Sequence, residues 1–166
     1  MISKDKYILE LEKKIEEIFD YSIKNPEIFI KALTHKSSSK NNYERLEFLG
    51  DAVLQLVITE SLHDNYPDHN EGSLSREKQS IVSKKTISEI SINLEIPDLL
   101  IAKNLNFNKS GALRQTIATN LMESLIGAIF KDGGYVSSKA SILKIFAKHL
   151  SVKDNIGLKD PKTLLQ

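Results

Sequence analysis

Three carboxylates lie close together in residues 43–54, which read Tyr-Glu-Arg-Leu-Glu-Phe-Leu-Gly-Asp-Ala-Val-Leu. At about 100° per helical residue, Glu44, Glu47 and Asp51 fall within an arc of roughly 60° on one face. Like charges placed so closely repel one another and gain only from a shared cation or a basic partner. The stripe therefore indicates a cation site, and the alternative is a solvated helical face that happens to be acidic.

Phe48 lies beside this acidic stripe and away from the apolar side of the same helix. The side that we expect to face the core carries Leu46, Leu49, Val53 and Leu56. A large ring at position 48 would be exposed on a monomer unless another surface covers it. The position predicts a contact with a protein partner, or alternatively with another helix of the same chain.

Glu123 is a second candidate, because it lies within residues 116–130, which are apolar almost all round. A carboxylate in a buried helix must be paired, protonated or bound to a metal, since desolvating it alone costs several kcal/mol. The two open interpretations are a metal ligand and a buried ion pair with an arginine such as Arg45 or Arg114.

Residues 44–54 resemble the signature of the ribonuclease III family, and the resemblance covers nearly the whole chain. It extends through residues 11–15, 32–37, 71–75, 123–130 and 132–134. The resemblance implies an all-α catalytic domain over residues 1–153 that forms a homodimer through Phe48. Residues 154–166 would then be a linker toward an absent double-stranded-RNA-binding domain, so we expect the chain to be a piece of a longer enzyme.

The function implied by this resemblance is double-strand-specific endoribonuclease activity on structured RNA, such as ribosomal RNA precursors. Metal-activated water would leave 5′-phosphate and 3′-hydroxyl ends. The matched catalytic residues are Glu44, Asp51 and Glu123; the matched metal ligands are Glu44, Asp51, Asn120 and Glu123; the accessory acids are Glu47 and Glu71. Hard oxygen ligands suit Mg²⁺, with Mn²⁺ as a substitute.

Asn120 departs from the family pattern, which has an aspartate three residues before Glu123. An asparagine offers one neutral carbonyl oxygen where a carboxylate offers two charged oxygens. Three interpretations remain open: a natural enzyme with weakened metal binding, an inactivated paralogue, and an engineered substitution. The alternative function is therefore a catalytically impaired ribonuclease III-like protein that binds RNA or assembles a ribonucleoprotein.

Candidate contacts to RNA phosphates are Arg76, Lys78, Lys84, Lys85, Lys103 and Lys109, although each could equally be solvated surface. A-form RNA would be recognised by shape and 2′-hydroxyl contacts rather than by sequence. For His35, in a matching Thr-His pair, we favour a hydrogen-bonded structural role. The Glu-x-x-His pairs of helical di-metal oxidases are absent.

The amino-acid composition limits the other functional classes to which the protein could belong. With 23 Lys and Arg against 22 Asp and Glu, the net charge of +1 is too small to indicate a nucleic-acid partner by itself. The absence of cysteine excludes disulfides and thiolate metal sites and fits a reducing compartment. No apolar run approaches a membrane span and no signal peptide is evident, so we expect a cytoplasmic protein with no membrane partner.

Apolar spacing of three and four residues, with only four prolines and seven glycines, predicts an all-α protein. The first three predicted helices cover residues 3–19, 26–33 and 44–62, and Asn25 caps the second. A long fourth helix is capped by Ser73 or Ser75 and ends before Pro97. The last two helices cover residues 116–130 and the stretch from Ser137 or Ser138 to Leu150. Gly133 and Gly134 separate the last two. Residues 104–111 are expected to be the most mobile loop.

Overall fold

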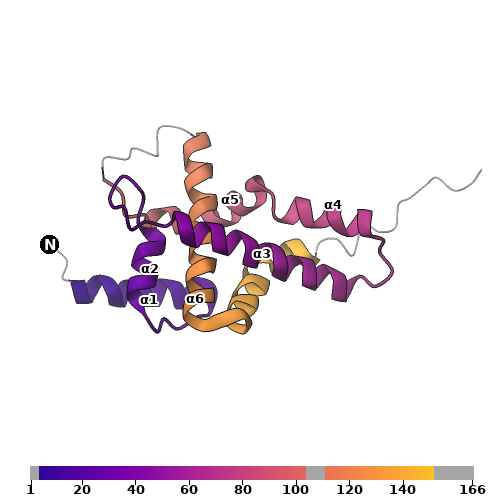
Figure 1. Ribbon diagram of the computed structural model, residues 1–166, viewed down its shortest axis with the longest axis horizontal. Coiled ribbons are helices and arrows are strands. Elements are labelled where there is room, and N and C mark those ends of the chain that lie inside the picture. Colours follow the sequence, from indigo (N-terminus) through magenta and orange to yellow (C-terminus); the bar gives the residue numbers. More distant parts are fainter. Residues whose placement is uncertain (1–3, 104–110, 152–166) are drawn as a thin grey trace, which may run out of the picture.

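The computed structural model describes residues 4–103 and 111–151, and its regular structure there is helical (Figure 1). The elements are α1 (Lys4–Phe19), α2 (Pro26–Leu33), α3 (Glu44–Asn65), α4 (Glu71–Ile81), α5 (Lys84–Asn93), the 3-10 helix η1 (Ile96–Leu99) and α6 (Gly111–Ser151). The described residues include one isolated bridge, between Thr34 and Ile101, and no strand. The predicted all-α class is confirmed. Of the loop predicted at residues 104–111, residues 104–110 lie outside the described residues, as does the linker from residue 154, and Gly111 begins α6.

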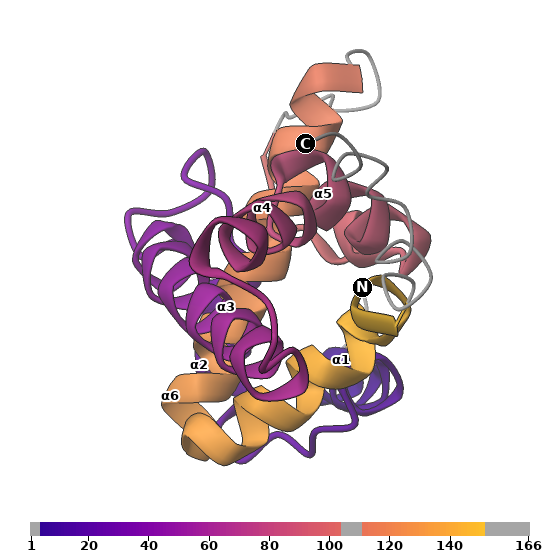
Figure 2. The same cartoon turned by 90° about the vertical axis from the view of Figure 1, so that its right-hand side faces the viewer.

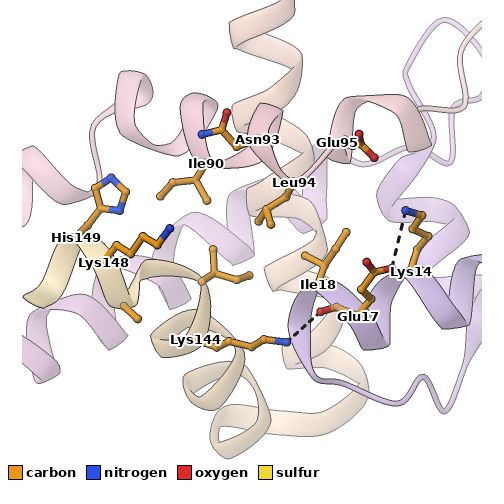
Figure 3. A pocket seen from close by; sticks show the side chains of 12 residues that line it. Lys14, Glu17, Ile18, Ile90, Asn93, Leu94, Glu95, Lys144, Lys148 and His149 are labelled. Carbon is orange, nitrogen blue, oxygen red and sulfur yellow. Dashed lines mark hydrogen bonds and ion pairs between the residues drawn. The ribbon is translucent and has the colours of Figure 1, made fainter.

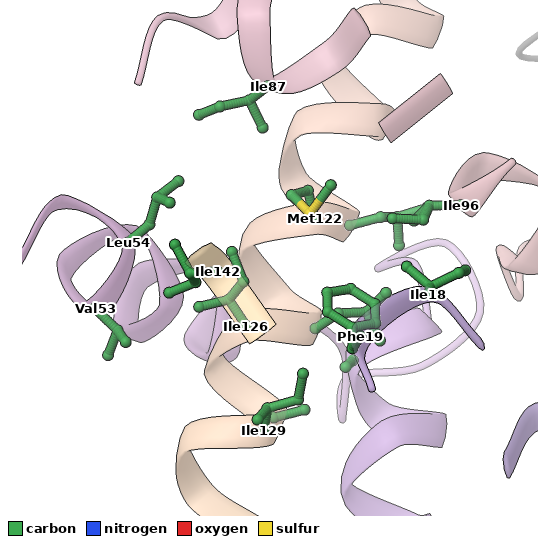
Figure 4. Packing of buried hydrophobic residues seen from close by; sticks show 14 of the residues in the cluster. Ile18, Phe19, Val53, Leu54, Ile87, Ile96, Met122, Ile126, Ile129 and Ile142 are labelled. Atoms are coloured by element: carbon green, nitrogen blue, oxygen red, sulfur yellow. The ribbon is translucent and has the colours of Figure 1, made fainter. Parts of the chain in front are cut away.

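Helix α6 is the central element, because it contacts every other helix of the described chain. Figures 1 and 2 show its first half running between α3 and α5. In Figure 4, Met122, Ile126 and Ile129 of α6 lie among side chains from the surrounding helices, including Leu54 of α3 and Phe19 of α1. A helix covered on all sides must be apolar almost all round, which explains the composition of residues 116–130.

A break at Gly134 divides α6 into two helical segments. Gly134 has φ 78° and ψ −172°, a backbone conformation that glycine adopts without steric cost. The second segment returns along α1, where Ser141 donates a hydrogen bond of 2.7 Å to the carbonyl oxygen of Phe19. The break that the sequence predicted at Gly133 and Gly134 is therefore confirmed.

The sequence predicted the N-terminal cap of α2 correctly but not the starts of α4 and α5. Asn25 accepts a hydrogen bond from the backbone N–H of Glu27 at 3.2 Å, as predicted for the start of α2. The predicted cap of α4 was wrong, because Asn70 accepts from the N–H of Ser73 at 2.9 Å. The predicted single helix up to Pro97 was also wrong: Ser83 accepts from the N–H of Thr86 at 3.2 Å and starts α5 as a separate helix.

The buried face of α3 differs from the predicted face at Leu56, whose side chain is 56% exposed. Val53 and Val57 are buried, and Leu56 lies about 100° round the helix from Val57. The core therefore covers a narrower arc of α3 than the leucine pattern predicted.

None of the helices in the described residues has the length and apolar character that a membrane-spanning segment requires.

Two glycines allow α3 and α6 to cross with their backbones in contact. A Cβ atom on Gly50 would lie 1.7 Å from the carbonyl oxygen of Glu123, and one on Gly127 would lie 2.2 Å from the carbonyl oxygen of Leu46. Neither position has room for a methyl group, because the obstructing atoms belong to the facing backbone. The interaxial distance at this crossing is thus set by two residues on two distant segments.

We expect Gly50→Ala to lower the free energy of unfolding by about 3 kcal/mol, because the added methyl group must push the two helices apart. Urea denaturation followed by circular dichroism measures this change. The control is Gly72→Ala in α4, where the nearest atoms to the added Cβ are 3.6 Å away. The control should be neutral or stabilising by up to about 1 kcal/mol. Equal effects of the two variants would contradict the close crossing.

Candidate active site

An open hollow of about 430 Å³ lies where α3 crosses α6. Its lining consists of Glu44, Glu47, Phe48 and Asp51 from α3, Asn120 and Glu123 from α6, and Lys36 and Tyr43 from the connection between α2 and α3. The acidic stripe and the isolated carboxylate that stood out in the sequence thus share one site. Four carboxyl groups and one lysine surround it, so the wall of the hollow is rich in negative charge.

The local sequence explains how each helix presents these side chains. Asn42 accepts a hydrogen bond from the backbone N–H of Glu44 at 3.0 Å, at the start of α3. On α6, Asn120 and Glu123 are three residues apart and therefore lie on the same face. Because Gly50 contacts the backbone of Glu123 itself, the crossing brings that face of α6 next to the acidic stripe of α3.

Glu123 experiences the strongest electrostatic perturbation of the site. Burial, the charge of Asp51 and the charge of Glu47, in that order, raise the pKa of Glu123 to about 8. Neither Arg45 nor Arg114 forms an ion pair with it within the described residues, so the alternative of a buried ion pair is not supported. In the absence of a cation, Glu123 therefore holds a proton at neutral pH.

The acids of α3 differ in their surroundings. Burial and then the charge of Glu44 raise the pKa of Glu47, while Lys36 opposes the shift and Asp51 adds to it. Asp51 accepts hydrogen bonds from the amide nitrogen of Gln55 at 3.0 and 3.1 Å. Glu44 pairs with Lys36, whose ammonium nitrogen is 3.4 Å from its carboxylate oxygen. The site thus has more carboxyl groups than neighbouring cations to neutralise them.

Asn120 lines the hollow together with Tyr43, which is buried. Burial is the main cause of the raised pKa of Tyr43, and Asn120 acts against this rise. The amide supplies a neutral oxygen at the point where the family pattern predicts a carboxylate. Asn120 therefore adds an uncharged oxygen to a wall that otherwise carries four carboxyl groups.

The donor set fits a hard cation that keeps part of its water shell. No three His, Asp or Glu side chains in residues 4–103 and 111–151 converge closely enough to coordinate one ion by themselves. The acids instead surround a hollow, and Mg²⁺ usually retains several waters and uses only a few protein carboxylates. Glu44, Asp51, Glu123 and the carbonyl oxygen of Asn120 would hold such an ion.

Glu71 does not join this hollow within one chain. It is exposed at the start of α4, where it lines a separate groove with Thr59 and Leu62 from the second half of α3. The sequence resemblance grouped Glu71 with the other acids, and the structure places it apart from them.

The candidate RNA-contacting residues are spread over two helices and a connection. Arg76 and Lys78 belong to α4, Lys84 and Lys85 to α5, and Lys103 follows Ile101, whereas Lys109 lies outside the described residues. Lys84 donates a hydrogen bond of 2.8 Å to Thr116, about one helical turn before Asn120 on α6. The sequence analysis placed four of these residues on one helix, which the break before Ser83 corrects.

His35 has the structural role that the sequence predicted. Its Nδ1 atom is 2.9 Å from the hydroxyl oxygen of Ser37, and its backbone N–H donates to the carbonyl oxygen of Ile101 at 2.9 Å. Burial lowers the pKa of His35, and the charge of Lys36 adds to this effect. These contacts fix the connection from which Lys36 and Tyr43 reach the hollow.

Lys36 and Tyr43 are the two lining residues that the sequence analysis missed. Tyr43 directly precedes the acidic stripe, and Lys36 lies inside the matching stretch 32–37. Their positions next to recognised motifs were the available signal, although neither residue type indicates metal chemistry.

Phe48 projects from the rim of the hollow with 82% of its side chain exposed. The alternative that it packs against another helix of the same chain is therefore wrong. The exposed ring leaves the partner contact as the remaining interpretation.

A larger hollow of about 540 Å³ lies between α1, α5 and the end of α6 (Figure 3). Its walls combine apolar side chains such as Ile18 and Leu94 with lysines such as Lys144 and Lys148. None of the residues that the sequence analysis singled out lies there. The candidate chemistry therefore belongs to the smaller acidic hollow.

Comparisons with known proteins identify the family of this chain. The family described as Ribonuclease-III-like matches residues 25–150. Proteins named Ribonuclease 3 are 37% identical over 153 residues in Alkalilimnicola ehrlichii, 38% over 147 in Colwellia psychrerythraea and 39% over 135 in Shewanella halifaxensis. These matches cover 92%, 88% and 81% of this chain and 67%, 55% and 60% of the respective relative.

Solved structures show the same fold. The nuclease domain of ribonuclease III from Campylobacter jejuni, described as flexible in a region involved in its dimer formation, is similar with a TM-score of 0.76 and 36% identity. That match covers 82% of this chain and 96% of the domain. Dicer from Pichia stipitis, at 24% identity and a TM-score of 0.62 over 81% of this chain and 60% of that one, shares the fold.

The raised pKa of Glu123 predicts a stability that falls with increasing pH. In the unfolded chain this carboxyl titrates near 4.5, and in the folded chain near 8. Between these values the unfolded state has already lost the proton that the folded state retains, so stability decreases as pH rises through this window. Allowing for partial exposure, the loss should be about 1–3 kcal/mol in metal-free buffer.

Glu123→Gln should remove this contribution, so the variant gains stability relative to the parent chain between pH 5 and pH 8. Urea denaturation at the two pH values measures the difference. Glu89→Gln, which changes an exposed residue of α5, is the matched control and should leave the pH dependence as it is. Parallel pH profiles for the parent and Glu123→Gln would refute the assignment.

Proposed function

This chain belongs to the ribonuclease III family, and on that basis we propose that it is the catalytic domain of a metal-dependent endoribonuclease specific for double-stranded RNA. The observation that carries the proposal is the shared hollow that joins Glu44, Glu47 and Asp51 of α3 to Glu123 of α6. Structured transcripts such as ribosomal RNA precursors are the proposed substrates. The chain spans 55–67% of the length of the relatives compared, so the proposal concerns this domain.

Each acid has a distinct part in the proposed reaction. Bound Mg²⁺, or Mn²⁺ in its place, would supply the positive charge that activates water and stabilises the leaving oxygen. Asp51 and Glu44 offer charged oxygens from α3, and Glu123 becomes a charged ligand once its proton leaves. Asn120, which lines the same hollow, would offer its neutral carbonyl oxygen. The proposed products carry 5′-phosphate and 3′-hydroxyl ends.

A homodimer completes the proposed arrangement. The exposed Phe48 beside the acidic hollow suits insertion into a second copy of the chain, because burying one aromatic ring contributes substantially to an interface. Two hollows, one from each copy, would face the two strands of an RNA duplex. The exposed lysines of α5 then provide candidate contacts to the phosphates, which dominate affinity for nucleic acids.

One observation favours a second candidate function. Asn120 contributes no negative charge at the position where the family pattern has an aspartate, so the site is less attractive to a divalent ion than one with aspartate. A chain impaired in this way would bind duplex RNA or assemble a ribonucleoprotein without cutting it.

The cleavage test compares the parent chain with Asn120→Asp on labelled duplex RNA at limiting Mg²⁺. We expect cleavage by the parent and a roughly tenfold faster rate for Asn120→Asp, since an added charged ligand worth about 1.4 kcal/mol corresponds to a factor of ten. Glu123→Gln and Asp51→Asn should abolish cleavage while leaving the chain folded. If neither the parent nor Asn120→Asp cuts RNA that both bind tightly, the second candidate function replaces the first.

We expect Phe48→Ala to weaken the dimer by roughly 30-fold or more, which corresponds to about 2 kcal/mol for a buried aromatic anchor. Sedimentation equilibrium measures the dissociation constant. Val136→Ala, which shortens another highly exposed apolar residue, is the control and should dimerise as the parent does. Unchanged dimerisation of Phe48→Ala would exclude Phe48 as the anchor.

A further inference from the structure

Among the described residues that line the acidic hollow, Lys36 is the only basic one. Its ammonium nitrogen is 3.4 Å from a carboxylate oxygen of Glu44, and no other acid of the hollow has an ion pair in the described residues. A lysine at this place partly neutralises a set of carboxylates that would otherwise repel one another.

The backbone on both sides of Lys36 is anchored, although its side chain is not. His35 donates its N–H to Ile101, and Ser37 bonds to the ring of His35 through both its hydroxyl and its N–H. The Lys36 side chain itself is 65% exposed, and its partner Glu44 is 53% exposed. The ammonium group is therefore held near the hollow but can move away from Glu44 without disturbing the fold.

Glu44 is the carboxylate of the hollow for which two cations would compete. The carboxylate that pairs with Lys36 is also one of those that the proposed function assigns to the divalent ion. A monovalent ammonium on an exposed pair gains little, whereas a divalent ion interacts with several carboxylates simultaneously.

We infer that Lys36 is a resident counter-ion of the acidic site, which competes with the divalent metal for Glu44 and so weakens metal binding. The inference rests on the proposed function, because it takes the metal to enter this hollow. In the metal-free chain Lys36 holds Glu44 in place, and it gives way when the metal binds. Lys36 thereby lowers the affinity of the site for the divalent metal although it is not itself a metal ligand.

The test measures the dissociation constant of Mn²⁺ by calorimetry at low ionic strength, without RNA. Lys36→Met keeps the length of the side chain and removes the charge. We expect this variant to bind Mn²⁺ about three- to tenfold more tightly, because a unit positive charge beside the divalent ion is removed in a partly screened surface site. The gain should shrink in high salt.

Two matched variants show whether the effect on Mn²⁺ binding comes from the charge of Lys36 and from its position beside the hollow. Lys40→Met removes the same charge from an exposed residue of the same connection that does not line the hollow, and should bind Mn²⁺ as the parent does. Lys36→Arg retains the charge and should also resemble the parent. In a Glu44→Gln background, Lys36→Met should have a smaller effect, since the shared carboxylate is gone.

Two results with Lys36→Met would overturn the inference by itself. Weaker Mn²⁺ binding by Lys36→Met would mean that Lys36 orients Glu44 as a ligand, and unchanged binding with a lower melting temperature would mean that it only tethers the connection. Either result leaves the proposed function intact. Absence of Mn²⁺ binding to the parent chain would instead overturn both the inference and the proposed function. Tighter Mn²⁺ binding by Lys36→Met together with no RNA cleavage would overturn the proposed nuclease activity alone.

Discussion

Backbone contact between α3 and α6 is the constraint on which the rest of the structure depends. Gly50 and Gly127 bring each helix against the carbonyl oxygens of the other, so the crossing is closer than any pair of side-chain-bearing residues would permit. The acidic face of α3 thereby meets Glu123, which is more than 70 positions later in the sequence. A small change in this distance would alter the core and the site together.

The crossing of α3 and α6 also has an electrostatic cost, because it places the carboxyl group of Glu123 next to other acids. Helix α6 must be apolar because other elements surround it, yet it carries Glu123 at the edge of the core, next to Asp51 and Glu47. A carboxyl group placed there keeps its proton until a cation compensates for the neighbouring charges. The fold thus gives up stability to hold a group whose charge depends on what enters the hollow, as functional sites often do.

The surface along α3 contains features that a single isolated chain does not satisfy. Phe48 is exposed beside the acids, and Glu71 lies in a groove at the other end of α3. Lys36 compensates for part of the negative charge at the rim. These features have a common explanation if the site functions in an assembly, with a second copy against Phe48 and the RNA backbone against the basic residues.

The sequence by itself determined the features that depend on neighbouring residues. Helical periodicity predicted the all-α class and the acidic face of α3, Asn25 identified the start of α2, and Gly134 marked the break in α6. The family resemblance then identified the acids by position. The cap at Asn70 and the break before Ser83 are also local features, but the sequence did not single them out because several nearby serines were equally able to cap a helix.

Only the tertiary structure decided which of these residues meet. It joined Glu123 to the acids of α3, separated Glu71 from them, exposed Leu56 and brought in Lys36 and Tyr43. The physical reason is that a helical period fixes directions around one axis, whereas the distance between two axes depends on the side chains packed between them. Here that distance depends on two glycines whose importance appears only when the helices are placed together.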